Sequence, residues 1–147
     1  MTMLLETITA QDVQIGLHAK DWEDAIRQAA APLLASGAIQ QSYIDGMITS
    51  VHENGPYFVL AKGLALAHAR PECGAVRLAL NFTTFDPPVP FGAGENDPVR
   101  LVITLAATDP DSHLDLLGEL AEVLMDESRM QQLFSAASPE AFCALLG

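Results

Sequence analysis

The stretch GLALAHARP, residues 63–71, is an apolar run that ends on a histidine and an arginine and is closed by a proline. Short apolar runs bounded by glycine and proline are typical of buried strands. In α/β sheets the functional site usually lies at the ends of strands. The stretch therefore predicts a buried strand that delivers the side chains of His68 and Arg70 to one edge of a sheet.

Around this stretch, helical patterns lie towards both ends of the chain and strand patterns lie in the middle. Apolar residues at helical spacing, with capping and stop residues, predict helices over residues 22–36, 41–54, 110–124, 128–136 and 139–146. Short apolar runs predict strands over residues 57–60, 64–66, 75–84 and 99–107. Asp86-Pro87-Pro88 is expected to end the third strand, and residues 91–98 are expected to form a loop. This order predicts an α/β or α+β layered domain in which helices cover a central sheet.

The composition limits the classes of partner. The chain has 147 residues, enough for one domain, with 19 acidic and 7 basic residues and a formal charge of −12. Such an acidic chain argues against nucleic acid and against anionic membrane surfaces, and it favours a partner with a basic docking face. Two cysteines, no signal-peptide pattern and no membrane-spanning run predict a reduced cytoplasmic protein without direct membrane insertion.

Four histidines, His18, His52, His68 and His113, are the candidates for chemistry near neutral pH. A neutral imidazole nitrogen is a good nucleophile. His68 is expected at a strand end, His113 in the first turn of a helix, where anions are favoured, and His52 near the end of the helix that leads into the strands. If these three ends converge, they form a pocket of imidazoles beside Arg70. The alternative for each histidine alone is a structural or surface role, and His18 is assigned no other.

The sequence patterns for metal binding, for carboxylate or serine catalysis and for nucleotide binding are weaker. The three histidines are separated by 16 and 45 positions, which is no short zinc pattern, so no metal is expected. The chain shows no clear catalytic pair of carboxylates, no serine in a nucleophile elbow and no P-loop. A metal-binding or hydrolytic enzyme built on the histidines stays open as an alternative of another class.

These residues resemble the enzyme IIA phosphocarrier of the bacterial phosphoenolpyruvate:sugar phosphotransferase system. The resemblance is to the mannitol/fructose-type superfamily, above all its ascorbate (SgaA/UlaC-like) branch, and it covers residues 22–146. The family's central motif is a run of small and apolar residues that ends Pro-His-Ala-Arg or Pro-His-Gly, and residues 63–72 align with it except that Ala67 stands in place of the proline. Further matching segments follow in order: residues 53–57, residues 91–92, residues 97–99, and His113-Leu114 with Leu117.

The resemblance implies one α/β domain over residues 1–147, with a central mixed β-sheet flanked by helices. It implies that His68 accepts a phosphoryl group on Nε2 and that His113 is the second active-site histidine. His52 stands where mannitol-type members carry an arginine about 16 residues before the acceptor, so His52 and Arg70 are expected to support the phosphoryl group. No cofactor is implied.

The implied function is a phosphotransferase component of sugar uptake. Phospho-HPr would donate the phosphoryl group to His68, and an enzyme IIB partner would take it, onto a cysteine, for an ascorbate-like or related sugar that enters through IIC at the membrane. A regulatory phosphoacceptor of the same fold is the alternative, and Ala67 favours it. Exposed apolar residues on the helices would permit a homodimer.

Overall fold

The core of the fold is a five-stranded mixed sheet with the strand order β1-β4-β5-β3-β2. The computed structural model describes residues 8–146, apart from the side chains of residues 110, 112 and 113. β1 runs parallel to β4 and β3 runs parallel to β5, whereas β4 and β5, like β2 and β3, are antiparallel. The strands are β1 (Val13–Leu17), β2 (Val59–Ala61), β3 (Leu64–Ala67), β4 (Ala79–Val89) and β5 (Val99–Ala106).

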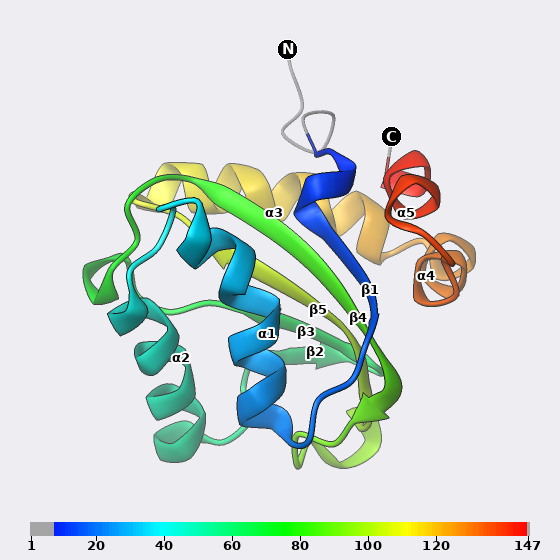
Figure 1. Cartoon of the computed structure of the whole chain (residues 1–147), viewed down its shortest axis with the longest axis horizontal. Coiled ribbons are helices and arrows are strands. Elements are labelled where there is room, and N and C mark those ends of the chain that lie inside the picture. Colours follow the sequence, from blue (N-terminus) through cyan, green and yellow to red (C-terminus); the bar gives the residue numbers. More distant parts are fainter. Residues whose placement is uncertain (1–7, 147) are drawn as a thin grey trace.

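Helices cover both faces of the sheet (Figure 1). One face packs against α1 (Trp22–Ala35) and α2 (Gln41–Asn54), whose buried side chains form one apolar cluster with that face. The other face packs in a second cluster against α3 (Pro110–Leu124), α4 (Glu127–Phe134) and α5 (Pro139–Leu146). The expected class, a central mixed sheet flanked by helices, is confirmed.

The four residues of β3 are buried and alternate in size. Successive side chains of a strand point to opposite faces. Leu64 and Leu66 enter the cluster with α3, while Ala65 and Ala67 enter the cluster with α1 and α2. The apolar run predicted to be a buried strand therefore is one, and it contributes to both clusters.

Several helix boundaries follow from local capping. Asp21 accepts a hydrogen bond from the backbone N–H of Asp24 at 2.8 Å, so it caps α1 as predicted. Asp126 caps α4 in the same way through the N–H of Arg129 at 3.1 Å. Gly55 follows α2 with a φ of +77°, a conformation that glycine adopts without steric cost. The expected spans of α2 and α5 are confirmed.

The predicted bounds of β4 were wrong, and β1 was missed. β4 begins at Ala79 rather than residue 75, and it continues through Asp86-Pro87-Pro88 to Val89. The ladder with β5 shifts register between Thr84 and Val89, and prolines are tolerated in strands at such irregularities. β1, which pairs only with β4 at the sheet edge, was not predicted at all, because its five residues include Gly16 and its burial does not alternate.

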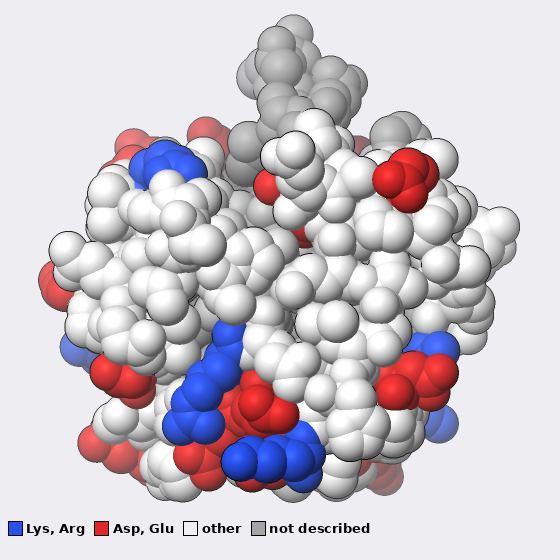
Figure 2. All heavy atoms as spheres, in the orientation of Figure 1, with Lys and Arg blue, Asp and Glu red and all other residues white. Residues whose placement is uncertain are grey.

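The excess of acidic residues does not form one patch on the face shown in Figure 2. Acidic and basic side chains lie interleaved along the lower edge of that face, and most of its remaining surface is uncharged (Figure 2). Within residues 8–146, no helix has the length and apolar character needed to cross a bilayer.

Candidate functional site

The ends of β3 and β5 meet at one edge of the sheet. The two strands are parallel, and Ala67 at the end of β3 is paired with Thr104 of β5. His68 therefore leaves the sheet beside the segment 107–109, which leads into α3. A cavity of about 540 Å³ opens at this edge. Its polar lining residues come from α2, from the segment before β2 and from the segments after β3 and β5. They are Tyr43, Ser50, Asn54, Tyr57, His68, Arg70, Glu72, Thr108 and Asp109.

The ring of His68 is held by a hydrogen bond to β3, the strand that precedes it. Nδ1 lies 2.8 Å from the carbonyl oxygen of Leu66. A carbonyl oxygen only accepts, so Nδ1 must carry the proton, and the neutral ring then has its lone pair on Nε2. The rings of Tyr57 and Phe58 lie 5.8 Å and 6.3 Å from the imidazole, centroid to centroid. His68 is half-buried, so its ring is fixed in orientation while still lining the cavity.

Two tyrosines hydrogen-bond to the backbone at His68 and Ala69. The hydroxyl of Tyr57 donates to the His68 carbonyl oxygen at 3.3 Å. The hydroxyl of Tyr43 accepts from the Ala69 N–H at 3.1 Å and donates to the Leu105 carbonyl of β5 at 2.8 Å. The Ala69 carbonyl lies 3.2 Å from the same hydroxyl. Tyr43 is buried, and burial raises the pKa of its phenol above the ordinary value of 10.0, so it stays a neutral donor.

Arg70 lies beside His68 at the edge of the sheet, as the sequence predicts. It is exposed, precedes the short helix η3 (Pro71–Cys73), and lines the same cavity as His68. Among the residues that the structure describes, no carboxylate forms an ion pair with its guanidinium. A guanidinium in this position is available to bind an anionic group in the cavity.

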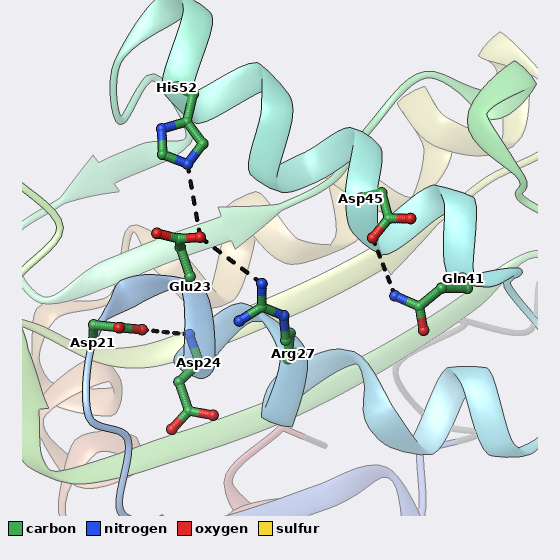
Figure 3. Close-up of polar contacts among 7 residues, drawn as sticks. All are labelled: Asp21, Glu23, Asp24, Arg27, Gln41, Asp45 and His52. Carbon is green, nitrogen blue, oxygen red and sulfur yellow. Dashed lines mark hydrogen bonds and ion pairs between the residues drawn. The ribbon is translucent and has the colours of Figure 1, made fainter.

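His52 lies apart from this cavity. Its ring packs against Trp22 of α1, with centroids 5.1 Å apart, and its Nε2 lies 3.7 Å from a carboxylate oxygen of Glu23. Figure 3 shows His52 pointing from α2 towards Glu23, which also contacts Arg27. His52 is not among the residues that line the cavity, so the structure does not bring it to His68.

His113 lies in the first turn of α3, immediately after the segment that lines the cavity. Its backbone is therefore near the edge where His68 lies, but its side chain is outside the described part of the structure. His18 follows β1 and is exposed. Within the described residues, no group of three or more histidine, cysteine, aspartate or glutamate side chains is arranged to hold a metal ion.

Several site residues were not predicted from the sequence. Ser50 and Asn54 line the cavity from α2, four residues apart, a spacing that places them on one face of the helix. That spacing, just before the Gly55-Pro56 stop, is a signal that was available in the sequence. Tyr43 gave no comparable signal, because at helical spacing it reads as an ordinary core residue of α2.

Comparison with known families identifies a match over almost the whole chain. The family described as "Phosphoenolpyruvate-dependent sugar phosphotransferase system, EIIA 2" matches residues 6–147. The mannitol-specific cryptic phosphotransferase enzyme IIA component of Escherichia coli (strain K12) is 41% identical over 120 residues, which are 82% of this chain and 81% of that protein. The ascorbate-specific PTS system EIIA component of the same organism is 30% identical over 124 residues, 84% of this chain and 80% of that protein.

Solved structures give the same assignment. The solution structure of the mannitol-specific cryptic enzyme IIA CmtB from Escherichia coli is 35% identical, with a TM-score of 0.89 and coverage of 98% of each chain. A complex of enzyme IIAMTL with phosphorylated enzyme IIBMTL from Escherichia coli contains a chain that is 27% identical, with a TM-score of 0.83; 95% of this chain and 96% of that chain are covered.

Proposed function

The chain belongs to the EIIA 2 family of the phosphoenolpyruvate-dependent sugar phosphotransferase system, and from this premise we propose that His68 Nε2 accepts a phosphoryl group from phospho-HPr and passes it to an enzyme IIB partner. Proteins of this family are phosphotransfer components. The observation that carries the choice of atom is the 2.8 Å contact between His68 Nδ1 and the Leu66 carbonyl oxygen. It leaves the lone pair on Nε2 of a residue that lines the cavity at the strand end.

The transfer needs no change of protonation at His68. The Nε2 lone pair forms a bond to phosphorus, the bond between phosphorus and the donor imidazole breaks, and that electron pair returns to the donor ring. The Nδ1 proton stays on His68 throughout. As Nε2 becomes bonded, positive charge develops on the ring, and the Leu66 carbonyl dipole stabilises it through the N–H. Catalysis is then mostly positioning and charge stabilisation, as in other phosphoryl transfers.

Groups around the cavity supply hydrogen bonds and charge for the phosphoryl oxygens. Arg70 is the cation in the lining, and Ser50, Asn54 and Thr108 offer neutral donors. His113 in the first turn of α3 is the second histidine of the proposal, and the helix start itself favours an anion. His52 packs on Trp22 beside Glu23, outside the cavity, so the proposal gives it no contact with the phosphoryl group.

The acceptor of the phosphoryl group is proposed to be an enzyme IIB, because a structural relative is seen in complex with phosphorylated enzyme IIB. HPr is proposed as the donor, and its basic face would be attracted by the net charge of −12. The transported compound is proposed to be an ascorbate-like or related sugar, chosen by the membrane component IIC. Transfer between these partners would take place in the cytoplasm.

The test is a labelling reaction with phosphoenolpyruvate, enzyme I and HPr, followed by intact-mass measurement. We expect an adduct of about 80 daltons, one phosphoryl group, that disappears in His68→Ala. His18→Ala is the matched control, since it removes an exposed histidine outside the cavity, and it should label like the unmodified protein. His113→Ala should label more slowly but completely. Full labelling of His68→Ala would refute the assignment.

A further inference from the structure

Both tyrosines of the chain hydrogen-bond to the same peptide unit, the one between His68 and Ala69. Tyr57 donates to its carbonyl oxygen, which belongs to His68, at 3.3 Å. Tyr43 accepts from its N–H, which belongs to Ala69, at 3.1 Å. The two hydroxyls come from different elements, Tyr43 from α2 and Tyr57 from the segment before β2. One peptide plane is thus held at both of its polar ends.

This peptide unit lies just beyond the part of the chain that the sheet orients. β3 ends at Ala67, so the pairing with β5 does not extend to the peptide after His68. Tyr43 connects that peptide back to the sheet, because its hydroxyl also donates to the Leu105 carbonyl of β5 at 2.8 Å. Tyr43 is only 1% exposed and packs in the apolar cluster between the sheet and the helices α1 and α2. Close packing therefore holds its hydroxyl in one position.

We propose that Tyr43 and Tyr57 are positioning residues for the phosphoryl acceptor, which hold the His68–Ala69 peptide so that the imidazole keeps its bond to Leu66. This rests on the proposed function of His68. The torsion angles on both sides of the His68 Cα decide where its side chain points. If the peptide after His68 rotates, the ring moves relative to the Leu66 carbonyl, and the 2.8 Å contact that fixes the tautomer is lost. Small displacements of a nucleophile lower transfer rates strongly.

Loss of the Tyr43 hydroxyl and loss of the Tyr57 hydroxyl should lower the rate of transfer to different extents. Tyr43 is buried, and its hydroxyl has partners on both the loop and β5. Tyr57 is 44% exposed, and within the described residues its hydroxyl makes one hydrogen bond, which at 3.3 Å is longer than those of Tyr43. Water can therefore replace its hydroxyl. Its ring also touches the imidazole edge-on, a contact that phenylalanine preserves. Tyr43→Phe should therefore have the larger effect.

The test measures single-turnover labelling of the full chain by phospho-HPr at increasing donor concentration. Tyr43→Phe should lower the maximal rate about tenfold or more, with little change in the donor concentration that gives half the maximal rate, because Tyr43 is almost fully buried although it lines the cavity. Tyr57→Phe should lower it a few-fold. Thr83→Val is the control, since it removes a buried, hydrogen-bonded hydroxyl from the middle of β4. It should leave the maximal rate unchanged at temperatures where it is folded.

A second readout does not depend on phosphoryl transfer. Nitrogen NMR of isotope-labelled histidine should show His68 protonated on Nδ1 in the unmodified protein and as a mixture of tautomers in Tyr43→Phe. A single Nδ1–H tautomer together with an unchanged rate in Tyr43→Phe would overturn the positioning role. That result would leave His68 as acceptor intact. Conversely, if the unmodified protein takes no label, the proposed function fails, while the tautomer measurement still decides the role of Tyr43.

Discussion

The imidazole Nδ1 of His68 lies 2.8 Å from the carbonyl oxygen of Leu66, a residue of β3 two positions earlier in the chain. This contact converts an ordinary histidine into one with a defined nucleophilic nitrogen, because the proton is held on Nδ1. The contact forms where the strand ends, because His68 directly follows Ala67, the last residue of β3. The strand end and the tautomer are therefore set by the same local geometry.

Substituting Arg70 should slow transfer without preventing it. Arg70 lines the cavity with His68, and a guanidinium there would stabilise the charge on the phosphoryl oxygens. Arg70→Gln should reduce the single-turnover rate by about tenfold, less than a fully buried donor would. Arg129→Gln changes the net charge equally but lies on α4, beside Asp126. Equal slowing in both variants would attribute the effect to long-range attraction and remove Arg70 from the site.

Substituting alanine for two helical glycines should change the stability of the protein in opposite directions. Gly118 on α3 is exposed, and a Cβ there would meet no atom within 4 Å. Gly118→Ala should stabilise the protein by about 0.5–1 kcal/mol through helix propensity. A Cβ on Gly46 of α2 would lie 3.0 Å from Cys73 Sγ and 3.1 Å from Cys73 Cβ. Gly46→Ala should instead destabilise by about 1 kcal/mol or more, because α2 must move from η3.

Urea unfolding of the two glycine variants measures this difference directly. Because Cys73 belongs to η3, directly after the segment that contains His68 and Arg70, Gly46→Ala should also slow labelling, whereas Gly118→Ala should not. Stabilisation by both alanines would show that the contact between α2 and η3 is loose, and it would weaken the case for a rigid backbone behind the acceptor.

Stability at high pH should depend on Tyr43. Burial raises the pKa of its phenol in the folded protein above 10.0, while the unfolded chain ionises near the ordinary value. The folded state then binds the proton more tightly, so its stabilising contribution is complete below pH 10.0 and is lost as the pH rises towards the folded pKa. Tyr43→Phe removes this loss. Urea titrations from about pH 8 to about pH 11 should show a steeper decline in the unmodified protein and in Tyr57→Phe. Parallel declines in all three proteins would contradict the prediction.

Much of the fold could be predicted because its signals are local. The apolar run before His68, the cap at Asp21 and the stop at Gly55 act over a few residues, and the strands and helices they predict are present. β1 and the continuation of β4 through Pro87 could not be predicted this way. β1 depends on pairing with β4, which lies far along the sequence. The continuation of β4 depends on the pairing of Val89 with Val99 beyond the irregularity that contains the prolines, and no local pattern encodes either pairing.

The site was predictable only in part, for a similar reason. His68 and Arg70 follow directly from the end of β3. Which side chains of α2 face them depends on how that helix is rotated, so Ser50 and Asn54 enter the cavity while His52 packs on Trp22. The hydrogen bond from the His68–Ala69 peptide to Tyr43 could not be predicted, because a buried tyrosine at helical spacing resembles any other core residue. Ala67 precedes His68, and the two tyrosines restrain the chain on the other side of His68.

The most direct test of the central claim is to locate the phosphoryl group at atomic level. The chain would be prepared with isotope-labelled histidine, phosphorylated with phosphoenolpyruvate, enzyme I and HPr, and examined for coupling between phosphorus and the ring nitrogens. The account predicts coupling to Nε2 of His68, with the proton retained on Nδ1 opposite the Leu66 carbonyl. Phosphorus on Nδ1 of His68, or on any other histidine, would contradict it.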